Sequence, residues 1–328
     1  MESNITGRPT DERWNAHEGG QLQMRVDSRF GADGMPEGWW FGRVSAIAAT
    51  DDEVFVAHRG PAGDPIVVFG RDGQYRRSWG RDLFLLPHGL RLAPDGSIWA
   101  TDCDRHQVYR FDLQGRLLLT LGTRDTKGCT PDTFDMPTDM AVAADGTIYV
   151  ADGYGNSRIV RFAPDGRYLG EWGRKGRGPG EFDTPHSVVI GPDGLVYVSD
   201  RHNHRFQVFQ ADGTYVREIH GLGAAQCLAF APDGTPWTTT YRDVVELIAQ
   251  DSLGGRLFEL EPETFAIRRS LDVNAHWVHP TADGHLWLAC LAGNAQHAYP
   301  GWIAAPGGAV DERDYLTPDE EGPVREDG

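Results

Sequence analysis

The hydrophobic positions of the chain alternate with polar ones in short runs, and these runs come in pairs separated by an Asp-Gly turn. The pattern is clearest in LPHGLRLAPDGSIWATD, MPTDMAVAADGTIYVAD and TPHSVVIGPDGLVYVSD. It recurs in AAQCLAFAPDGTPWTTT, AHWVHPTADGHLWLAC and the degenerate RVSAIAATDDEVFVAHR. Alternation with a period of two around a short Gly-containing turn is typical of a β-hairpin. The pattern therefore predicts six copies of one hairpin.

A second hairpin pattern follows most copies of the first. It reads IVVFGRDGQYRRSWG, VYRFDLQGRLLLTLG, IVRFAPDGRYLGEWG, FQVFQADGTYVREIHG and LFELEPETFAIRRSL. Two hairpins make a four-stranded blade, so six copies predict an all-β, six-bladed β-propeller. The sixth copy lacks a clear last strand, and we expect the alternating stretch 22–26 to supply it. A parallel α/β fold is excluded because no helical periods separate the strands.

The repeats organise the chain as one domain. We predict a single propeller over residues 21–311, a polar tail at 1–20 and an acidic tail at 312–328. The 41 glycines and 20 prolines supply the many tight turns that such a fold requires.

The charge balance limits the partners. The chain has 31 Lys+Arg against 48 Asp+Glu, a formal net charge of −17, which repels nucleic acid and anionic membrane surfaces. No window approaches the ~18 apolar residues of a membrane span, and the N-terminus shows no apolar signal segment. The four cysteines have no CxxC spacing. We therefore expect a cytoplasmic protein with reduced thiols, either a monomer or a weak oligomer.

Histidine recurs at one register of the first hairpin. Seven residues before the turn Asp, blades one to six carry Ser45, His88, Thr138, His186, Gln226 and His276. The first strand of a blade lines the axis, so histidines from alternate blades are related by an approximate threefold and converge. Three histidines with an open fourth position are the pattern of a catalytic zinc site. The alternative is that they are polar residues lining a water-filled channel.

Polar residues also recur where the second strand of a blade ends, at the same rim as the start of the first strand. Arg59 and Arg201 occupy equivalent positions in blades one and four, and Tyr154 falls one residue later in blade three. Two guanidinium groups near a cation favour an anionic substrate, because Arg pairs bidentately with carboxylate. A phenol beside them and a zinc ion would have a lowered pKa and act as a base. A purely structural role for each arginine is the alternative.

The aspartates at these turns recur as well. Asp102, Asp152 and Asp200 stand at one register of blades two, three and four. We expect their carboxylates to accept hydrogen bonds from neighbouring turn amides.

These residues carry a resemblance. The repeats are similar to NHL repeats, and the strings LPHGL, PTD, DGYGNSRIV, TPHS and HRG resemble the peptidyl-α-hydroxyglycine α-amidating lyase family from about Val44 to Ala289. The resemblance implies a six-bladed propeller with a catalytic zinc on three histidines, which splits a peptidyl-α-hydroxyglycine into a peptide amide and glyoxylate. It also implies His88, His186 and His276 as the zinc ligands, the last by register. The catalytic residues that it implies are Tyr154, Arg59 and Arg201, with both arginines binding substrate.

The chain departs from the family pattern at three positions. Trp277 replaces an aspartate that helps the family to bind a structural calcium, which argues against that calcium here. Asn274 replaces a methionine two residues before the third histidine, and we expect it to contact the substrate. Gly155 replaces a cysteine of the family's disulfide.

The favoured hypothesis is a zinc-dependent lyase that cleaves the C–N bond of an N-substituted α-hydroxy acid, releasing an amide and glyoxylate or a similar α-oxo acid. A small anionic or peptide-like molecule would be its substrate. Two alternatives stay open: a zinc hydrolase of a small anionic substrate, and a non-catalytic NHL propeller that binds a partner on its rim.

Overall fold

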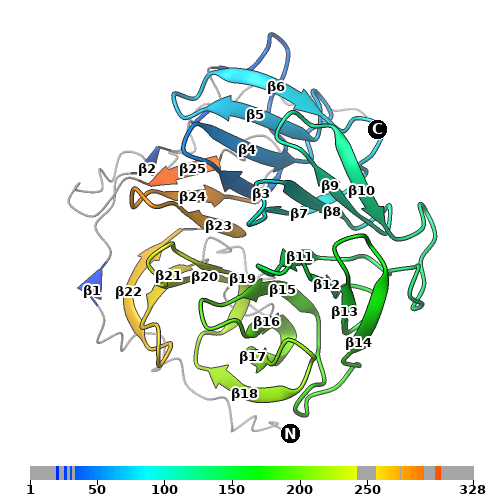
Figure 1. Cartoon of the computed structure of the whole chain (residues 1–328). Helices are drawn as coiled ribbons and strands as arrows, with labels where there is room; N and C mark the ends of the chain where they lie inside the picture. Colours follow the sequence, from blue (N-terminus) through cyan, green and yellow to red (C-terminus); the bar gives the residue numbers. More distant parts are fainter. Residues whose placement is uncertain are drawn as a thin grey trace, which may run out of the picture.

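In the computed structural model, residues 20–21, 26–27, 30–31, 34–241, 256–273, 275–291 and 300–303 are described. Their strands form six sheets, of which five have four strands and one has five. We number the sheets as blades one to six, in the order of their innermost strands along the chain (Figure 1).

The strands follow one another outward in each blade. Blade one contains β3 (Val44–Ala49), β4 (Glu53–His58), β5 (Ile66–Gly70) and β6 (Tyr75–Trp79). Blade two contains β7 (Pro87–Leu92), β8 (Ile98–Asp102), β9 (Gln107–Phe111) and β10 (Leu117–Leu121). Blade three contains β11 (Asp139–Val142), β12 (Ile148–Asp152), β13 (Arg158–Phe162) and β14 (Tyr168–Trp172).

The other three blades repeat this plan. Blade four contains β15 (Pro185–Ile190), β16 (Val196–Asp200), β17 (Arg205–Phe209) and β18 (Tyr215–His220), with the 3-10 turn η1 (Arg201–Asn203) after β16. Blade five contains β19 (Ala224–Phe230), β20 (Pro236–Tyr241), β21 (Arg256–Leu260) and β22 (Ile267–Asp272). Blade six contains β23 (Trp277–Pro280), β24 (Leu286–Ala289), β25 (Pro300–Ile303) and β2 (Val26–Asp27).

The innermost strands form a closed circle. Each of β3, β7, β11, β15, β19 and β23 packs against the next, and β23 packs against β3. Figure 1 shows the blades arranged around this centre, with blade six beside blade one. The first strand of each blade therefore faces the axis.

The Asp-Gly turns close the inner hairpins. The Asp95 carboxylate accepts the Ser97 N–H at 2.9 Å, and Gly96 takes a φ of +79° that favours glycine. The same Asp carboxylate to N–H bond recurs in the turns of blades three, four and five, at Thr147, Leu195 and Thr235. This shared turn places corresponding residues of each blade at corresponding depths along the axis.

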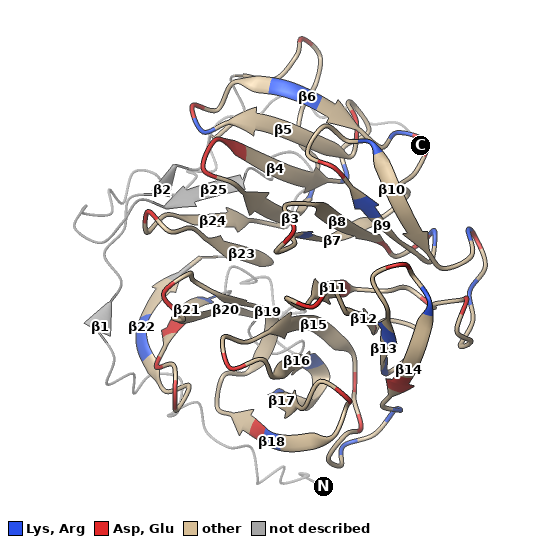
Figure 2. Ribbon diagram, in the orientation of Figure 1, with Lys and Arg blue, Asp and Glu red and all other residues tan. Residues whose placement is uncertain are grey.

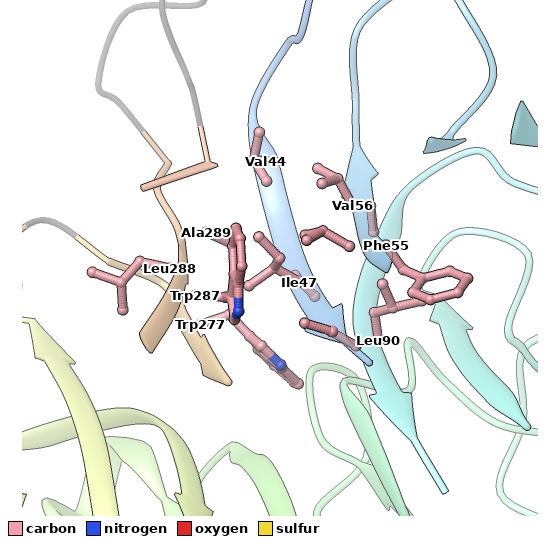
Figure 3. Packing of buried hydrophobic residues seen from close by; sticks show 14 of the residues in the cluster. Val44, Ile47, Phe55, Val56, Leu90, Trp277, Trp287, Leu288 and Ala289 are labelled. Atoms are coloured by element: carbon pink, nitrogen blue, oxygen red, sulfur yellow. The ribbon is translucent and has the colours of Figure 1, made fainter. Parts of the chain in front are cut away.

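The apolar faces of neighbouring blades pack together. Figure 3 shows Val44 and Ile47 of blade one between Leu90 of blade two and Trp287 of blade six. All four are fully buried. This cluster therefore packs blade one against both of its neighbours, blades two and six. The charged residues lie instead mainly in turns and outer strands (Figure 2).

The predicted propeller of four-stranded antiparallel blades is confirmed, but two details differ. Blade five gains a fifth strand, because β1 (Gly20–Gln21) pairs in parallel with β22. The strand that completes blade six is β2, which pairs with β25 through Val26 and Asp27. The predicted closing stretch 22–26 thus contributes Val26, while 22–25 lies outside the described residues.

Two further findings concern helices and thiols. No helix among the described residues has the length and apolar character needed to cross a bilayer. All four cysteines fall in the described part of the chain, and Cys103, Cys129 and Cys227 are free thiols.

Candidate active site

Three histidines meet on the axis. His88, His186 and His276 come from or immediately before β7, β15 and β23, and all three are buried. Their ring centroids lie 4.8, 4.9 and 5.1 Å apart, close to an equilateral triangle. Their ligand atoms lie within 4.8 Å of one another. The structure thus brings together the three residues that the register predicted.

The intervening blades orient the three rings. His88 Nδ1 lies 2.7 Å from the carbonyl oxygen of Thr138. His186 Nδ1 lies 2.6 Å from that of Gln226, and His276 Nδ1 lies 2.6 Å from that of Ser45. A carbonyl only accepts, so each Nδ1 carries the proton and donates it. Nε2 is therefore the nitrogen of each imidazole whose lone pair can bind a metal ion.

This donor set fits a metal ion. Burial lowers the pKa of His88 and His186 well below the usual range, and that of His276 to about 3. The imidazoles are therefore neutral at physiological pH, the form in which histidine binds metals. Their Nδ1–H bonds to backbone carbonyls are the outer contacts typical of metal-bound histidines. Three neutral Nε2 atoms, which no fourth His, Cys, Asp or Glu among the described residues joins, match an open, catalytic type of centre.

Tyr154 adjoins two of the histidines. Its hydroxyl lies 2.8 Å from His88 Nε2 and 3.1 Å from His186 Nε2. Gly153 sets its position, since a Cβ on Gly153 would lie 1.9 Å from the carbonyl oxygen of Pro185. The chain after β12 can therefore press directly against the segment that carries His186.

The predicted lowering of the Tyr154 pKa by a zinc ion and two arginines stays a prediction, and the groups of the chain itself shift this pKa the other way. Burial raises the pKa of Tyr154, although the charges of Arg201 and Arg59 act in the opposite direction. Removal from water outweighs the two cations here, because a phenolate loses more hydration on burial than the neutral phenol does.

Arg201 packs on Tyr154. Its guanidinium carbon lies 5.3 Å from the centroid of the Tyr154 ring, and its Nη1 donates to Gln226 Oε1 at 3.3 Å. The backbone N–H of Arg201 donates to the carbonyl of Thr184 at 3.1 Å. Thr184 adopts a φ of +61°, a left-handed conformation that is strained for a β-branched residue. The hydrogen bond that holds the Arg201 backbone is thus accepted by a residue with a strained backbone conformation, and such strain is common at functional sites.

Arg59 lies on the opposite side of the axis. Its Nε donates to the carbonyl of Pro87 at 3.0 Å, next to His88. Its charge lowers the pKa of both His88 and His276, so it lies near both rings. A hollow of about 190 Å³ borders Arg59 at the rim between blades one and two, and Arg81, Phe84 and Pro87 also line it. Arg59 therefore connects the histidines with a space open to solvent.

The three turn aspartates have the structural role that the sequence predicted. Asp102 accepts N–H bonds from Leu85 and Leu86 at 2.8 and 2.7 Å. Asp152 and Asp200 each accept a backbone N–H in the same way, from Asp135 and Asp183. These bonds fasten the end of each second strand to the segment that leads into the first strand of the same blade.

Some features of the site were not predicted. The carbonyls of Ser45, Thr138 and Gln226 orient the histidines, although their side chains show no pattern. The buried thiol of Cys103 lies near Tyr154, where a negative charge on the thiol would raise the pKa of the phenol. Asn274, the predicted substrate contact, lies outside the described residues.

Comparison with known proteins first defines the class. The NHL repeat family matches residues 84–111, 134–162 and 182–209, which lie in blades two, three and four. The folds of a streptogramin B lyase and of a gluconolactonase from Xanthomonas campestris are similar, with TM-scores of 0.56 and 0.57. These cover 86% and 88% of this chain and 97% of each of those chains, at 13% and 15% identity. The chain is thus a β-propeller with NHL repeats.

The sequence relatives are more specific. Over 241 residues the chain is 31% identical to the peptidylglycine alpha-amidating monooxygenase of Rattus norvegicus, covering 68% of this chain and 24% of that protein. It is 38% identical over 104 residues to peptidyl-alpha-hydroxyglycine alpha-amidating lyase 2 of Drosophila melanogaster, covering 31% of this chain and 26% of the relative. A probable lyase of that name from Caenorhabditis elegans is 37% identical over 107 residues, 32% of this chain and 31% of the relative.

These matches confirm the resemblance to the peptidyl-α-hydroxyglycine α-amidating lyases that the motifs predicted. The chain spans about a quarter to a third of the length of these curated relatives.

Proposed function

We propose that the six sheets close as a six-bladed propeller that holds one zinc ion and cleaves the C–N bond of an N-substituted α-hydroxy acid. The observation that carries the proposal is the convergence of His88, His186 and His276 with the Tyr154 hydroxyl between two of them. The sequence relationship to amidating lyases favours this reaction over others that a three-histidine centre can support. The products would be an amide and glyoxylate or a similar α-oxo acid.

His88, His186 and His276 would hold the zinc through Nε2. When bound, zinc supplies Lewis acidity, which polarises a substrate oxygen and favours loss of its proton. The chain contributes the fixed orientation of the rings, because each Nδ1–H is already bonded to a carbonyl.

The two arginines would bind the substrate carboxylate. Arg59 uses only its Nε in a hydrogen bond to Pro87 among the described residues, which leaves its terminal nitrogens available. Arg201 lies across the Tyr154 ring. A carboxylate between them would gain charge-assisted hydrogen bonds and hold the α-carbon beside the Tyr154 hydroxyl. The hollow beside Arg59 would receive the acyl group.

Tyr154 would move the proton. As phenolate, it takes the proton of the substrate hydroxyl, the C–O bond becomes a carbonyl, and the C–N bond breaks. The phenol then returns the same proton to the departing nitrogen, which becomes the amide. No water is consumed. Arg201 and Arg59 favour the phenolate against the effect of burial.

The test uses α-hydroxyhippurate with the purified full chain loaded with zinc. A lyase releases benzamide and glyoxylate in equal amounts, whereas a hydrolase that cuts the acyl bond releases benzoate. Hippurate, which lacks the hydroxyl, should be inert, and a chelator should abolish turnover. Formation of benzamide no faster than the spontaneous rate, across a panel of α-hydroxyglycine derivatives, would refute the proposal.

A further inference from the structure

A buried guanidinium lies next to the histidine layer. Arg91 belongs to β7, three residues after His88, and its side chain is only 15% exposed. The pairing of β7 with β8 shifts register between Pro87 and Leu90. Such a bulge interrupts the regular alternation of a strand. One innermost strand can therefore contribute both a histidine and an arginine to the axis.

Arg91 contacts the inner strands of four other blades. Its Nε and Nη2 bind both carboxylate oxygens of Asp139, in blade three, at 3.1 and 2.6 Å. Its Nη2 also donates to Ser187 Oγ of blade four at 3.0 Å. Its Nη1 donates to the carbonyl of Leu228 in blade five at 3.2 Å. Its guanidinium carbon lies 4.5 Å from the centroid of the Trp277 ring in blade six.

The charges of this cluster balance. Asp139 is fully buried, and its carboxylate accepts the Met140 and Val188 N–H groups in addition to Arg91. One buried carboxylate thus meets one buried guanidinium in bidentate geometry, and the indole face of Trp277 offers a further favourable contact for a cation. Both groups are satisfied within the protein.

Small side chains leave room for the arginine. The corresponding position, three residues after the histidine register, is alanine in blades one, three and five: Ala48, Ala141 and Ala229. In blade four it is Val189, and in blade six it is His279, whose Nε2 donates to the Ala49 carbonyl at 3.0 Å. A long side chain from one blade can therefore span the axis.

We propose that the Arg91 guanidinium is the resident cation of the propeller axis and replaces the structural calcium that the family resemblance implies. A calcium ion needs six to eight oxygen ligands. The residues here do not fit it, because Trp277 offers no oxygen and the Asp139 carboxylate is already paired. The bond network of Arg91 joins blades two to six beside the histidine layer, without an exogenous ion. The inference does not depend on the reaction that the histidines support.

The first test is thermal unfolding of the unmodified full chain, with zinc present throughout. Added calcium should leave the Tm unchanged, and so should prior removal of divalent ions with EGTA, followed by dialysis and reloading with zinc. A Tm that rises by several degrees with calcium would overturn the proposal.

The second test removes one partner of the ion pair. Arg91→Met should lower the Tm by about 10 °C, because it leaves a buried carboxylate without its counter-charge. Arg91→Met/Asp139→Leu, which removes both charges, should recover a large part of that loss. The matched control is Arg76→Met in β6, because the pair that Arg76 forms with Asp72 is exposed and contributes little. Equal Tm values for Arg91→Met and Arg76→Met would contradict the proposal.

The third test refills the site. Arg91→Ala removes the guanidinium and leaves the Asp139 carboxylate beside the Trp277 indole. Millimolar guanidinium should raise the Tm of Arg91→Ala and leave that of the unmodified chain unchanged, with equal sodium chloride as the salt control. Stabilisation of Arg91→Ala by calcium but not by guanidinium would show a metal site and overturn the assignment. If Arg91→Ala does not fold alone, its recovery in guanidinium is the same positive result, and the calcium test on the unmodified chain still decides.

Discussion

Alternate blades do different work at the same register. Blades two, four and six place an imidazole on the axis, whereas blades one, three and five place a backbone carbonyl behind it. A carbonyl is present whatever the side chain is. The intervening positions can therefore be serine, threonine or glutamine without disturbing the histidines. The comparison teaches that three blades supply the candidate metal ligands and the other three determine their orientation.

The largest effect should follow from breaking the ligand set. His186→Ala removes one of three Nε2 donors, so metal affinity should fall by at least about 100-fold, and lyase turnover with it. Ser45→Ala is the matched control from an intervening blade, because it retains the carbonyl that His276 uses. Elemental analysis should find about one metal ion per chain in Ser45→Ala and almost none in His186→Ala. Equal metal contents would argue against a three-histidine centre.

The next effect separates chemistry from metal binding. Tyr154→Phe keeps the ring on which Arg201 packs but removes the hydroxyl between His88 and His186. We expect kcat to fall by about 10²–10⁴-fold, the usual contribution of a general base, while the metal content stays the same. A variant that retains full kcat would exclude Tyr154 as the proton carrier.

A smaller effect concerns the pH dependence of stability, through a buried histidine in one of the intervening blades. His58 of blade one is buried, its Nε2 lies 2.9 Å from the Asp64 carbonyl, and burial lowers its pKa to about 4 from 6.5. The unfolded chain therefore binds this proton as the pH falls from 6.5, and the folded protein does not. The shifted pKa of His58 therefore contributes about 3 kcal/mol to the free energy of unfolding above pH 6.5. This contribution is lost as the pH falls from 6.5 to 4.

His58→Asn retains an acceptor for the Gly60 N–H but does not titrate in this range. Chemical denaturation at pH 7 and pH 4.5 should show a smaller acid loss in His58→Asn than in the unmodified chain. An identical pH dependence in the two proteins would show that His58 already titrates normally in the folded state.

The smallest effect should be the same in the two sets of blades, because it concerns a turn that both sets share. Away from the axis, Gly96 of blade two and Gly234 of blade five close the same turn, with φ of +79° and +87°. An added Cβ meets no atom within 4 Å at Gly96 and only Pro192 at 3.8 Å at Gly234. Gly96→Ala and Gly234→Ala should each cost about 1 kcal/mol of unfolding free energy through backbone strain alone. A difference of several kcal/mol between them, measured by denaturation, would mean that the turns are not equivalent.

Sequence patterns located the site because each blade repeats one turn. The turn aspartate fixes the depth of the residue seven positions earlier, so the histidine register translated directly into a triangle on the axis. Arg59, Arg201 and Tyr154 were located by the same repeat, at the ends of the second strands. Where the repeat holds, residues at equivalent positions of the repeat occupy equivalent places in their blades.

The patterns failed where alternation along a strand does not show which way a side chain faces, where burial decides, and where a segment has no repeat. Arg91 was not predicted, because the bulge in β7 breaks the alternation that tells which side chains face the axis. The effect of burial, which raises the pKa of Tyr154 within the chain, was also not predicted, because a residue type and its neighbours do not reveal how completely it is removed from water. The pairing of β1 with β22 comes from a segment with no repeat signal.

The hydrogen bond from His276 to Ser45 has a consequence for biosynthesis. It joins residues 231 positions apart, the second near the start of the propeller and the first near its end. A nascent chain displays His88 and His186 long before His276 is synthesised, and His276 is oriented only once the last blade meets the first. Any ion held by all three imidazoles must therefore enter after translation of the propeller, at the end of folding.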